Sequence, residues 1–194
     1  MRFAFLSAAL SLSLSALSQN PWHPPSAKAR LSEVRYSPLA GGVVGRQGPL
    51  REYRLSPDST AARITSLRVG LTPREDWRIV QCLEVVYASS GGRSDTLLLG
   101  GADGADWQPP YRLRENQTLT GVSGAGGWFV DAIQFHFSDG ATSARYGGTG
   151  GDTAFGLHLH TQPDGAPRST LLGFYGSEHD GLLESIGLVF WPLL

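Results

Sequence analysis

Residues 172–194, at the end of the chain, read LGFYGSEHDGLLESIGLVFWPLL. Two apolar runs, residues 171–174 and 182–190, flank a polar segment that extends from Ser177 to Gly181. Apolar residues that alternate on either side of a loop containing glycine and aspartate are typical of a β-hairpin. The stretch therefore predicts two antiparallel strands with the ionisable side chains at their turn.

The second arm of this hairpin has the same apolar spacing as two earlier segments. The pattern is apolar-x-x-apolar-x-apolar-x-aromatic, and it begins at Val80, Val130 and Leu183, at nearly equal intervals. Each repeat has room for about four short strands of ordinary length. Sheets with one apolar face must pack together to bury it, so the sequence predicts an all-β body with approximate threefold symmetry.

Composition agrees with an all-β domain and excludes some classes of partner. The 194 residues include 25 Gly and 12 Pro but only 17% charged residues, which favours short strands and tight turns. The formal net charge is −1 and no Lys/Arg cluster is present, so nothing favours binding to nucleic acid or to an anionic membrane. Cys82 is the only cysteine, so no internal disulfide is expected, and it reads as a small buried hydrophobe.

The N-terminal segment predicts export. Residues 1–18 have one Arg, an apolar run and small residues at their end, which is typical of a secretory signal peptide. The run is too short for a comfortable membrane span, so we expect a secreted, extracellular protein without one. Residues 19–38 are rich in Pro and Ser and predict an irregular or extended leader. Asn116 begins an N-glycosylation sequon, which has meaning only in a eukaryotic source.

Residues 39–194 resemble the jacalin-related lectins, proteins with a jacalin-like lectin domain. The resemblance lies in a Gly-Gly turn at Gly41, in GFYG followed by LLESIG at residues 173–187, and in LTGVSG at residues 119–124. Tyr146-Gly147 with Gly150 and Phe155 also matches. It implies a β-prism of three four-stranded antiparallel Greek-key sheets that binds carbohydrate, usually without metal, at loops clustered at one end.

The resemblance also implies which residues contact the sugar. A glycine-rich turn supplies backbone groups, a loop in the second repeat shapes specificity, and a Gly-x-x-x-Asp segment in the last hairpin supplies a carboxylate. Here the Asp of that segment falls on Glu184, the Gly falls on Asp180, and the loop is one residue longer. The candidate carbohydrate-binding residues are Gly41, Gly42, Trp128, Phe129, Asp180, Gly181, Leu182 and Glu184.

The chemistry of these residues suits sugars, and each has a structural alternative. A carboxylate only accepts hydrogen bonds, so it can pair with two adjacent hydroxyl groups, whereas Asp180 and Glu184 could equally be solvated residues that close a hairpin. The Trp128 indole offers a flat apolar face to a pyranose ring, or it begins a strand and belongs to the core. The two glycines could form a turn and nothing more.

The expected function is a secreted carbohydrate-binding protein that is not an enzyme. The alternative is a secreted β-prism module for structure or protein interaction that has lost sugar binding, which the altered Gly-x-x-x-Asp segment favours. No nucleophile elbow or phosphate-binding loop is present. His158 and His160 would share one face of a strand, but no third ligand follows by spacing, so no metal or cofactor is expected. Self-association is common in the family that the chain resembles.

Overall fold

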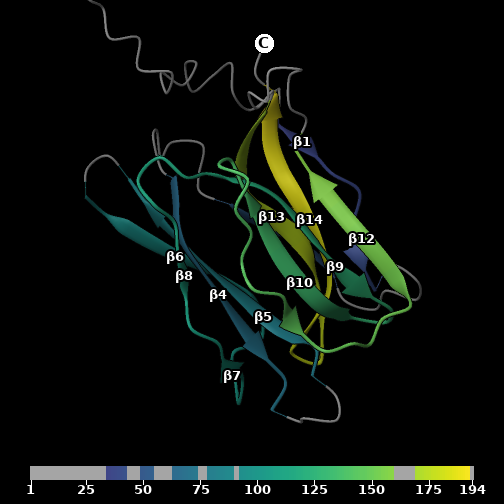
Figure 1. Cartoon of the computed structure of the whole chain (residues 1–194). Coiled ribbons are helices and arrows are strands. Elements are labelled where there is room, and N and C mark those ends of the chain that lie inside the picture. Colours follow the sequence, from purple (N-terminus) through teal and green to yellow (C-terminus); the bar gives the residue numbers. More distant parts are fainter. Residues whose placement is uncertain are drawn as a thin grey trace, which may run out of the picture.

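The structure is a computed structural model that describes residues 34–42, 49–54, 63–73, 78–89, 92–159 and 169–192. The described residues form antiparallel strands and their connections (Figure 1). The predicted signal peptide and residues 19–33 of the predicted leader lie outside them. Within these ranges the chain contains no helix of the length and apolarity that a membrane crossing needs.

The strands belong to three sheets, which we name A, B and C. Sheet A contains β1 (Arg35–Tyr36), β2 (Ala40–Gly41), β3 (Leu50–Arg54), β13 (Ser169–His179) and β14 (Leu182–Pro192). Sheet B contains β4 (Arg63–Leu71), β5 (Val80–Ala88), β6 (Ser94–Gly100), β7 (Asp106–Trp107) and β8 (Tyr111–Arg112). Sheet C contains β9 (Leu119–Gly126), β10 (Val130–Phe137), β11 (Tyr146–Gly147) and β12 (Thr153–His158).

Each sheet is built on a central hairpin with outer strands that follow a Greek-key order. In sheet C the spatial order is β12-β9-β10-β11, and in sheet B it is β7-β4-β5-β6. Sheet A has the same arrangement around the closing hairpin, but its outer strands come from the N-terminal part of the chain. The predicted all-β class with antiparallel sheets is therefore confirmed.

The strand count differs from four in two of the sheets. One outer position of sheet A is divided between β1 and β2, which both pair with β14, and one outer position of sheet B is divided between β7 and β8, which both pair with β4. Both interruptions contain proline: Pro38 in sheet A, and Pro109 with Pro110 in sheet B. Proline has no N–H to donate to a sheet, which accounts for the breaks. Because β1 pairs with Val189 and Phe190, sheet A also includes residues that the sequence placed in the leader.

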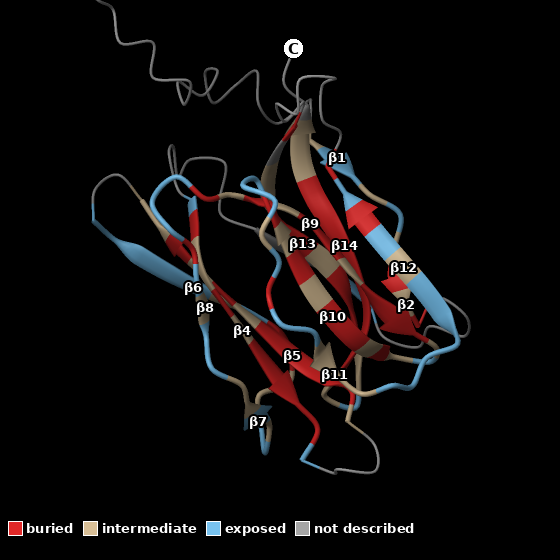
Figure 2. Cartoon of the chain, in the orientation of Figure 1, coloured by how far each residue is buried: buried red, intermediate tan, exposed pale blue. Residues whose placement is uncertain are grey.

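The three apolar arms recognised in the sequence are β5, β10 and β14, the second strand of each central hairpin. The expected alternation is observed on β5, where Leu83, Val85 and Tyr87 are buried and Glu84 is half-buried. The core contains side chains from all three sheets, including Phe135 and Phe174, the largest fully buried ones, and the buried strand segments are seen in Figure 2. Burying each such side chain stabilises the fold by roughly 1.5–3 kcal/mol.

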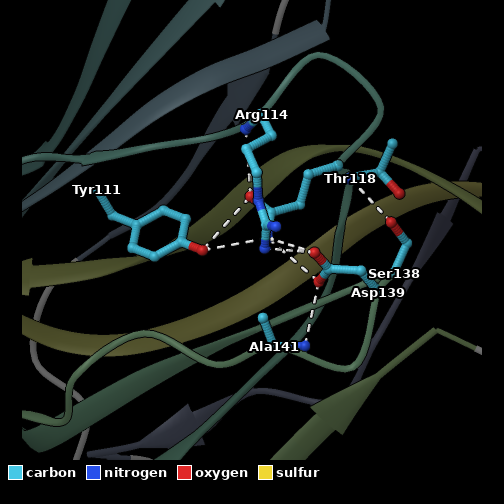
Figure 3. Close-up of polar contacts among 7 residues, drawn as sticks. Tyr111, Arg114, Thr118, Ser138, Asp139 and Ala141 are labelled. Atoms are coloured by element: carbon cyan, nitrogen blue, oxygen red, sulfur yellow. Dashed lines mark hydrogen bonds and ion pairs between the residues drawn. The ribbon is translucent and has the colours of Figure 1, made fainter.

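A polar cluster ties the crossover between sheets B and C to the turn after β10 (Figure 3). The buried Gln117 amide donates hydrogen bonds to the Tyr111 hydroxyl (3.1 Å) and to the Asp139 carboxylate (3.1 Å). Arg114 adds an ion pair of 2.6 Å to the same carboxylate. The hydrogen bond from Gln117 is the first of several causes that lower the pKa of Asp139. Asn116, the sequon residue, is exposed beside this cluster.

Candidate functional site

The three central hairpins share an irregularity close to their turns. In each, one residue of the second strand has no partner across the hairpin, and these extra residues are Gln81 on β5, Asp131 on β10 and Glu184 on β14. Such a β-bulge re-aims a side chain and is often found beside binding sites. The bulges therefore place three polar residues at matching positions, close to the end of the body where β4 ends and β14 begins (Figure 1).

Loops that follow an outer strand cross this end and contact the turn of a neighbouring hairpin. Gly42 lies against the carbonyl of Trp128, Gly101 against Gly181, and Gly148 against the carbonyl of Arg78. Any side chain on these three glycines would overlap backbone atoms of the neighbouring turn, at 2.0, 2.9 and 2.6 Å respectively. Close approach of backbone to backbone thus explains why glycine stands at all three positions.

Gln81 is bound within its own loop. Its side-chain amide donates hydrogen bonds to the carbonyl oxygens of Gly101 (3.0 Å) and Asp103 (2.8 Å). The side chain is buried, at 7% exposure, and holds the loop that follows β6 against the hairpin. This polar group is occupied by the protein itself.

Glu184 is directed into the protein, which bears on its predicted role. Its side chain is 3% exposed, and Oε2 accepts a hydrogen bond of 2.7 Å from the Ser177 hydroxyl. Ser177 in turn lies 2.7 Å from the hydroxyl of Ser185. In this arrangement the carboxylate stabilises the closing hairpin and is not displayed to a ligand.

Asp131 is different, because glycines surround its carboxylate. A Cβ atom at Gly150 would lie 2.6 Å from Oδ1, and one at Gly151 would lie 2.8 Å from Oδ2, so no other residue could stand at these positions without displacing the carboxylate. The side chain is half-buried. Burial is the main cause that raises the pKa of Asp131, followed in the same direction by the negative charge of Asp152, while a hydrogen bond from the Gly127 backbone opposes both.

The sequence reasoning missed Asp131, although a signal was present. Residues 127–131 read GWFVD, which is an intact Gly-x-x-x-Asp segment in the second hairpin. Superposing the three apolar arms puts Asp131 at the position of Glu184. The family resemblance directed attention to the last hairpin, where the Gly and the Asp of the segment are both replaced.

Trp128 and Phe129 form the turn between β9 and β10, next to Asp131. The Trp128 side chain is 70% exposed, so it does not belong to the core, which was the structural alternative. Phe129 is half-buried, and its carbonyl accepts a hydrogen bond of 3.1 Å from the Gly127 N–H. An exposed indole beside a carboxylate places an apolar face and a hydrogen-bond acceptor in the same region.

Gly41 and Gly42 lie between this turn and the closing hairpin. Gly41 pairs with Ser185 at a φ of 89°, a backbone conformation that favours glycine. The N–H of Gly42 donates a hydrogen bond of 2.6 Å to the carbonyl of Glu184, so it is already occupied. The described part of this turn therefore packs sheet A against the Trp128 turn, and residues 43–48 lie outside the described residues.

Asp180, Gly181 and Leu182 form the turn of the closing hairpin, and they face a different loop. The Asp180 side chain is 85% exposed and lies 3.5 Å from the His179 imidazole. The carbonyl of Gly181 accepts a hydrogen bond of 2.9 Å from the N–H of Gly101, and Leu182 pairs with His179. The eight predicted residues thus gather at one end of the molecule, but their polar side chains do not converge.

Comparisons with known proteins agree with this architecture. The sequence model of the jacalin-like lectin domain matches residues 42–189. Similar solved structures include a Malaysian banana lectin (16% identity, TM-score 0.60, covering 82% of this chain and 99% of that chain) and the agglutinin of Calystegia sepium (18%, 0.59, 80% and 96%). A third is a mannose-binding jacalin-related lectin from Ananas comosus (18%, 0.58, 82% and 98%). No curated protein sequence matches this chain.

The family match covers most of the chain, and the chain therefore belongs to the jacalin-like lectin domain family. The structural neighbours, at identities of 16–18%, share its fold. The family is one of lectins and not of enzymes, and its members support carbohydrate binding as the general class of activity.

Proposed function

We propose that this protein binds carbohydrate at the turn between β9 and β10, with Asp131 as the central hydrogen-bond acceptor. The observation that carries the proposal is the contrast among three matching bulge positions. Side-chain bonds hold Gln81 to its own loop and Glu184 to Ser177, whereas the Asp131 carboxylate is half-buried among glycines and accepts a hydrogen bond from the Gly127 backbone. A carboxylate in such a setting can accept charge-assisted hydrogen bonds from two hydroxyl groups of one sugar ring.

The neighbours of Asp131 complete a surface that suits a sugar. The backbone of residues 148–152 lies close to the Asp131 carboxylate, and Gly150 and Gly151 have no side chains that would cover it. A sugar bound to the carboxylate could therefore also contact this backbone. The exposed indole of Trp128 offers an apolar face for the C–H side of a pyranose. This differs from the site that the family resemblance implied, which placed the carboxylate on the closing hairpin.

The test is calorimetric titration of the folded protein with mannose and oligomannosides, preceded by a glycan array. These probes follow from the mannose-binding relative in Ananas comosus. Asp131→Asn is expected to weaken binding by about 10- to 100-fold, because a hydrogen bond to a charged group contributes about 1.5–3 kcal/mol. Asp180→Asn changes an exposed carboxylate of another hairpin turn in the same way and should leave binding unchanged.

The outcomes separate three cases. Loss with Asp131→Asn alone supports the proposed site. Loss with Asp180→Asn alone moves the site to the closing hairpin, as the resemblance implied. If the unaltered protein binds no glycan on the array, carbohydrate binding itself is rejected.

A second candidate function is a β-prism module for structure or protein interaction that no longer binds sugar. The burial of Glu184 favours it, because the carboxylate at the family's position is used internally. A protein partner captured by the folded domain, and not displaced by monosaccharides, would support this function over the first.

Export and self-association are further parts of the proposal. The pattern of residues 1–18 supports secretion, and N-terminal sequencing of the protein from its source would find a mature chain starting near residue 19. Self-association would raise the affinity for clustered glycans through multivalency. Analytical ultracentrifugation of the mature protein would reveal a monomer if that part is incorrect.

A further inference from the structure

Two histidines on the outer face of sheet C lean toward each other across β9. His136 on β10 and His158 on β12 both pair with Gly121, which stands between them on β9. Their backbones are thus two strand spacings, or about 9.6 Å, apart. Their ring centroids are nevertheless only 4.8 Å apart. The two imidazoles therefore converge above the middle strand.

The absence of a side chain at Gly121 makes this convergence possible. A Cβ atom there would lie 2.6 Å from Nδ1 of His158, so any other residue would push the ring away. Gly156 leaves similar room on the other side, because a Cβ atom there would lie 3.2 Å from Nε2 of His158. On the His136 side, Nε2 lies 2.7 Å from the hydroxyl of Ser123, which also belongs to β9.

The pair is accessible from solvent and stands apart from the core. Phe135, Phe137 and Leu157 point inward and are buried, so the alternation of β-strands directs His136 and His158 outward. His136 is half-buried and His158 is exposed, and β12 carries mostly exposed residues in Figure 2. The exposed ring of His158 thus faces both solvent and the ring of His136.

Neutral imidazole is a preferred ligand of Zn²⁺ and Cu²⁺. One ion with bonds of about 2.0–2.1 Å and tetrahedral angles needs its two nitrogen donors about 3.4 Å apart. Rings whose centroids are 4.8 Å apart can bring one nitrogen of each to that separation.

We propose that His136 and His158 form a two-histidine site for a divalent transition-metal ion, Cu²⁺ or Zn²⁺, on the outer face of sheet C. Water fills the remaining coordination positions, since no group of three or more His, Cys, Asp or Glu side chains is placed to hold a metal anywhere in the described ranges. The site therefore binds its ion more weakly than one with four protein ligands. Cu²⁺ binds more tightly than Zn²⁺, as the general order of metal affinities requires.

The partner of His158 differs from the one that the sequence suggested. The sequence pairs His158 with His160 on one face of a strand, and the spacing of residues along the chain identifies no third ligand. The structure supplies the partner from β10, which lies 22 residues earlier in the chain and pairs with the same glycine. His160 lies outside the described residues.

The experiment titrates the mature, folded protein with Cu²⁺ and then with Zn²⁺, using calorimetry and competition against a metal indicator. One ion per chain is expected. His136→Gln and His158→Gln should each weaken binding at least tenfold, because each removes one of two donors. His179→Gln removes a histidine that lies beside Asp180 in the closing turn, and it should have no effect.

Thermal unfolding provides a second readout, because an ion that binds only the folded state raises Tm. The rise should occur in the unaltered protein and vanish in both variants, each compared with its own Tm without metal. The proposal is overturned if the unaltered protein binds neither ion saturably, or if only one of the two substitutions weakens binding. Loss of binding with His160→Gln, and not with His136→Gln, would also overturn it.

Discussion

Substitution of Gly42 by alanine tests whether this residue is a packing element or a contributor to a ligand site. Gly42 is buried between two hairpins, and its φ lies outside the range that disfavours other residues. A Cβ atom there would lie 2.0 Å from the carbonyl oxygen of Trp128 and 2.8 Å from that of Glu184. Both contacts are with backbone, so rotation of a side chain cannot relieve them.

The magnitude follows from these distances. Ordinary contacts to a Cβ atom begin at 3.4 Å, so the Trp128 turn would have to move by more than 1 Å. Overpacking of this kind costs about 1–3 kcal/mol. The shift would also break the hydrogen bond from the Gly42 N–H to the Glu184 carbonyl, and a buried unsatisfied group costs about 1–3 kcal/mol. Gly42→Ala should therefore lower the free energy of unfolding by roughly 2–6 kcal/mol.

The assay is urea unfolding followed by tryptophan fluorescence, with thermal unfolding in parallel. The urea midpoint should fall at an unchanged m-value, and Tm should fall by roughly 4–24 °C for a domain of this size. Gly104→Ala is the matched control, because Gly104 has a φ of 69° but a Cβ atom there would meet nothing within 4 Å beyond its chain neighbours. It should cost about 1–2 kcal/mol through backbone strain alone.

A free energy of unfolding within about 0.5 kcal/mol of the unaltered protein would refute the packing argument. If that stable variant also failed to bind sugar, Gly42 would be a ligand-contacting residue, as the sequence first indicated. A loss of stability larger than that of Gly104→Ala would instead show that Gly42 is needed for packing of the fold.

Three more predictions concern titratable and buried groups. Sugar binding at Asp131 needs the ionised carboxylate, so it should be full above the raised pKa of this residue and should be lost at a pH where an ordinary aspartate is still charged. Calorimetry across that pH range measures the loss. Asp152→Asn should move the midpoint of the loss to lower pH, and an unmoved midpoint would contradict the coupling between the two carboxylates. Gln117→Ala should destabilise the fold by about 1–3 kcal/mol in urea, because it leaves the hydrogen-bonding groups around Asp139 without their buried partner, and an unchanged urea midpoint would contradict this. Cys82 has 0% exposure, and burial raises the pKa of its thiol to about 11. The thiol should therefore resist a thiol reagent near neutral pH until urea unfolds the chain. Rapid labelling of the folded protein would instead show that β5 opens.

The fold could be predicted from the sequence because its signals are local and repeated. Alternation along β5 depends only on which neighbouring residues are apolar, and the same pattern on β10 and β14 indicated three similar sheets. Proline residues in the sequence also mark where the outer strands are interrupted. They do not indicate which strands pair on either side of each interruption. Which outer strand completes sheet A depends on contacts between the two ends of the chain, and no local pattern reports those.

The site was harder to predict, because a bulge is a property of two strands together. Asp131 and Glu184 occupy the same position in their repeats, and both are acidic. The sequence reasoning named Glu184 and Asp180 and left Asp131 out, since the family carries its carboxylate in the last hairpin. What separates the two residues is the direction of their side chains, and this depends on the strand opposite.

The residue across the hairpin decides that direction. Next to Glu184, Ser177 pairs with Ser185 and its hydroxyl donates to the carboxylate. At the matching place beside Asp131 stands Ala125, which has no hydroxyl to hold a carboxylate inward. Asp131 is also shorter by one methylene, so its oxygens stay near the glycines that surround them. A carboxylate with an internal side-chain donor becomes part of the fold, and one without it keeps lone pairs for a ligand.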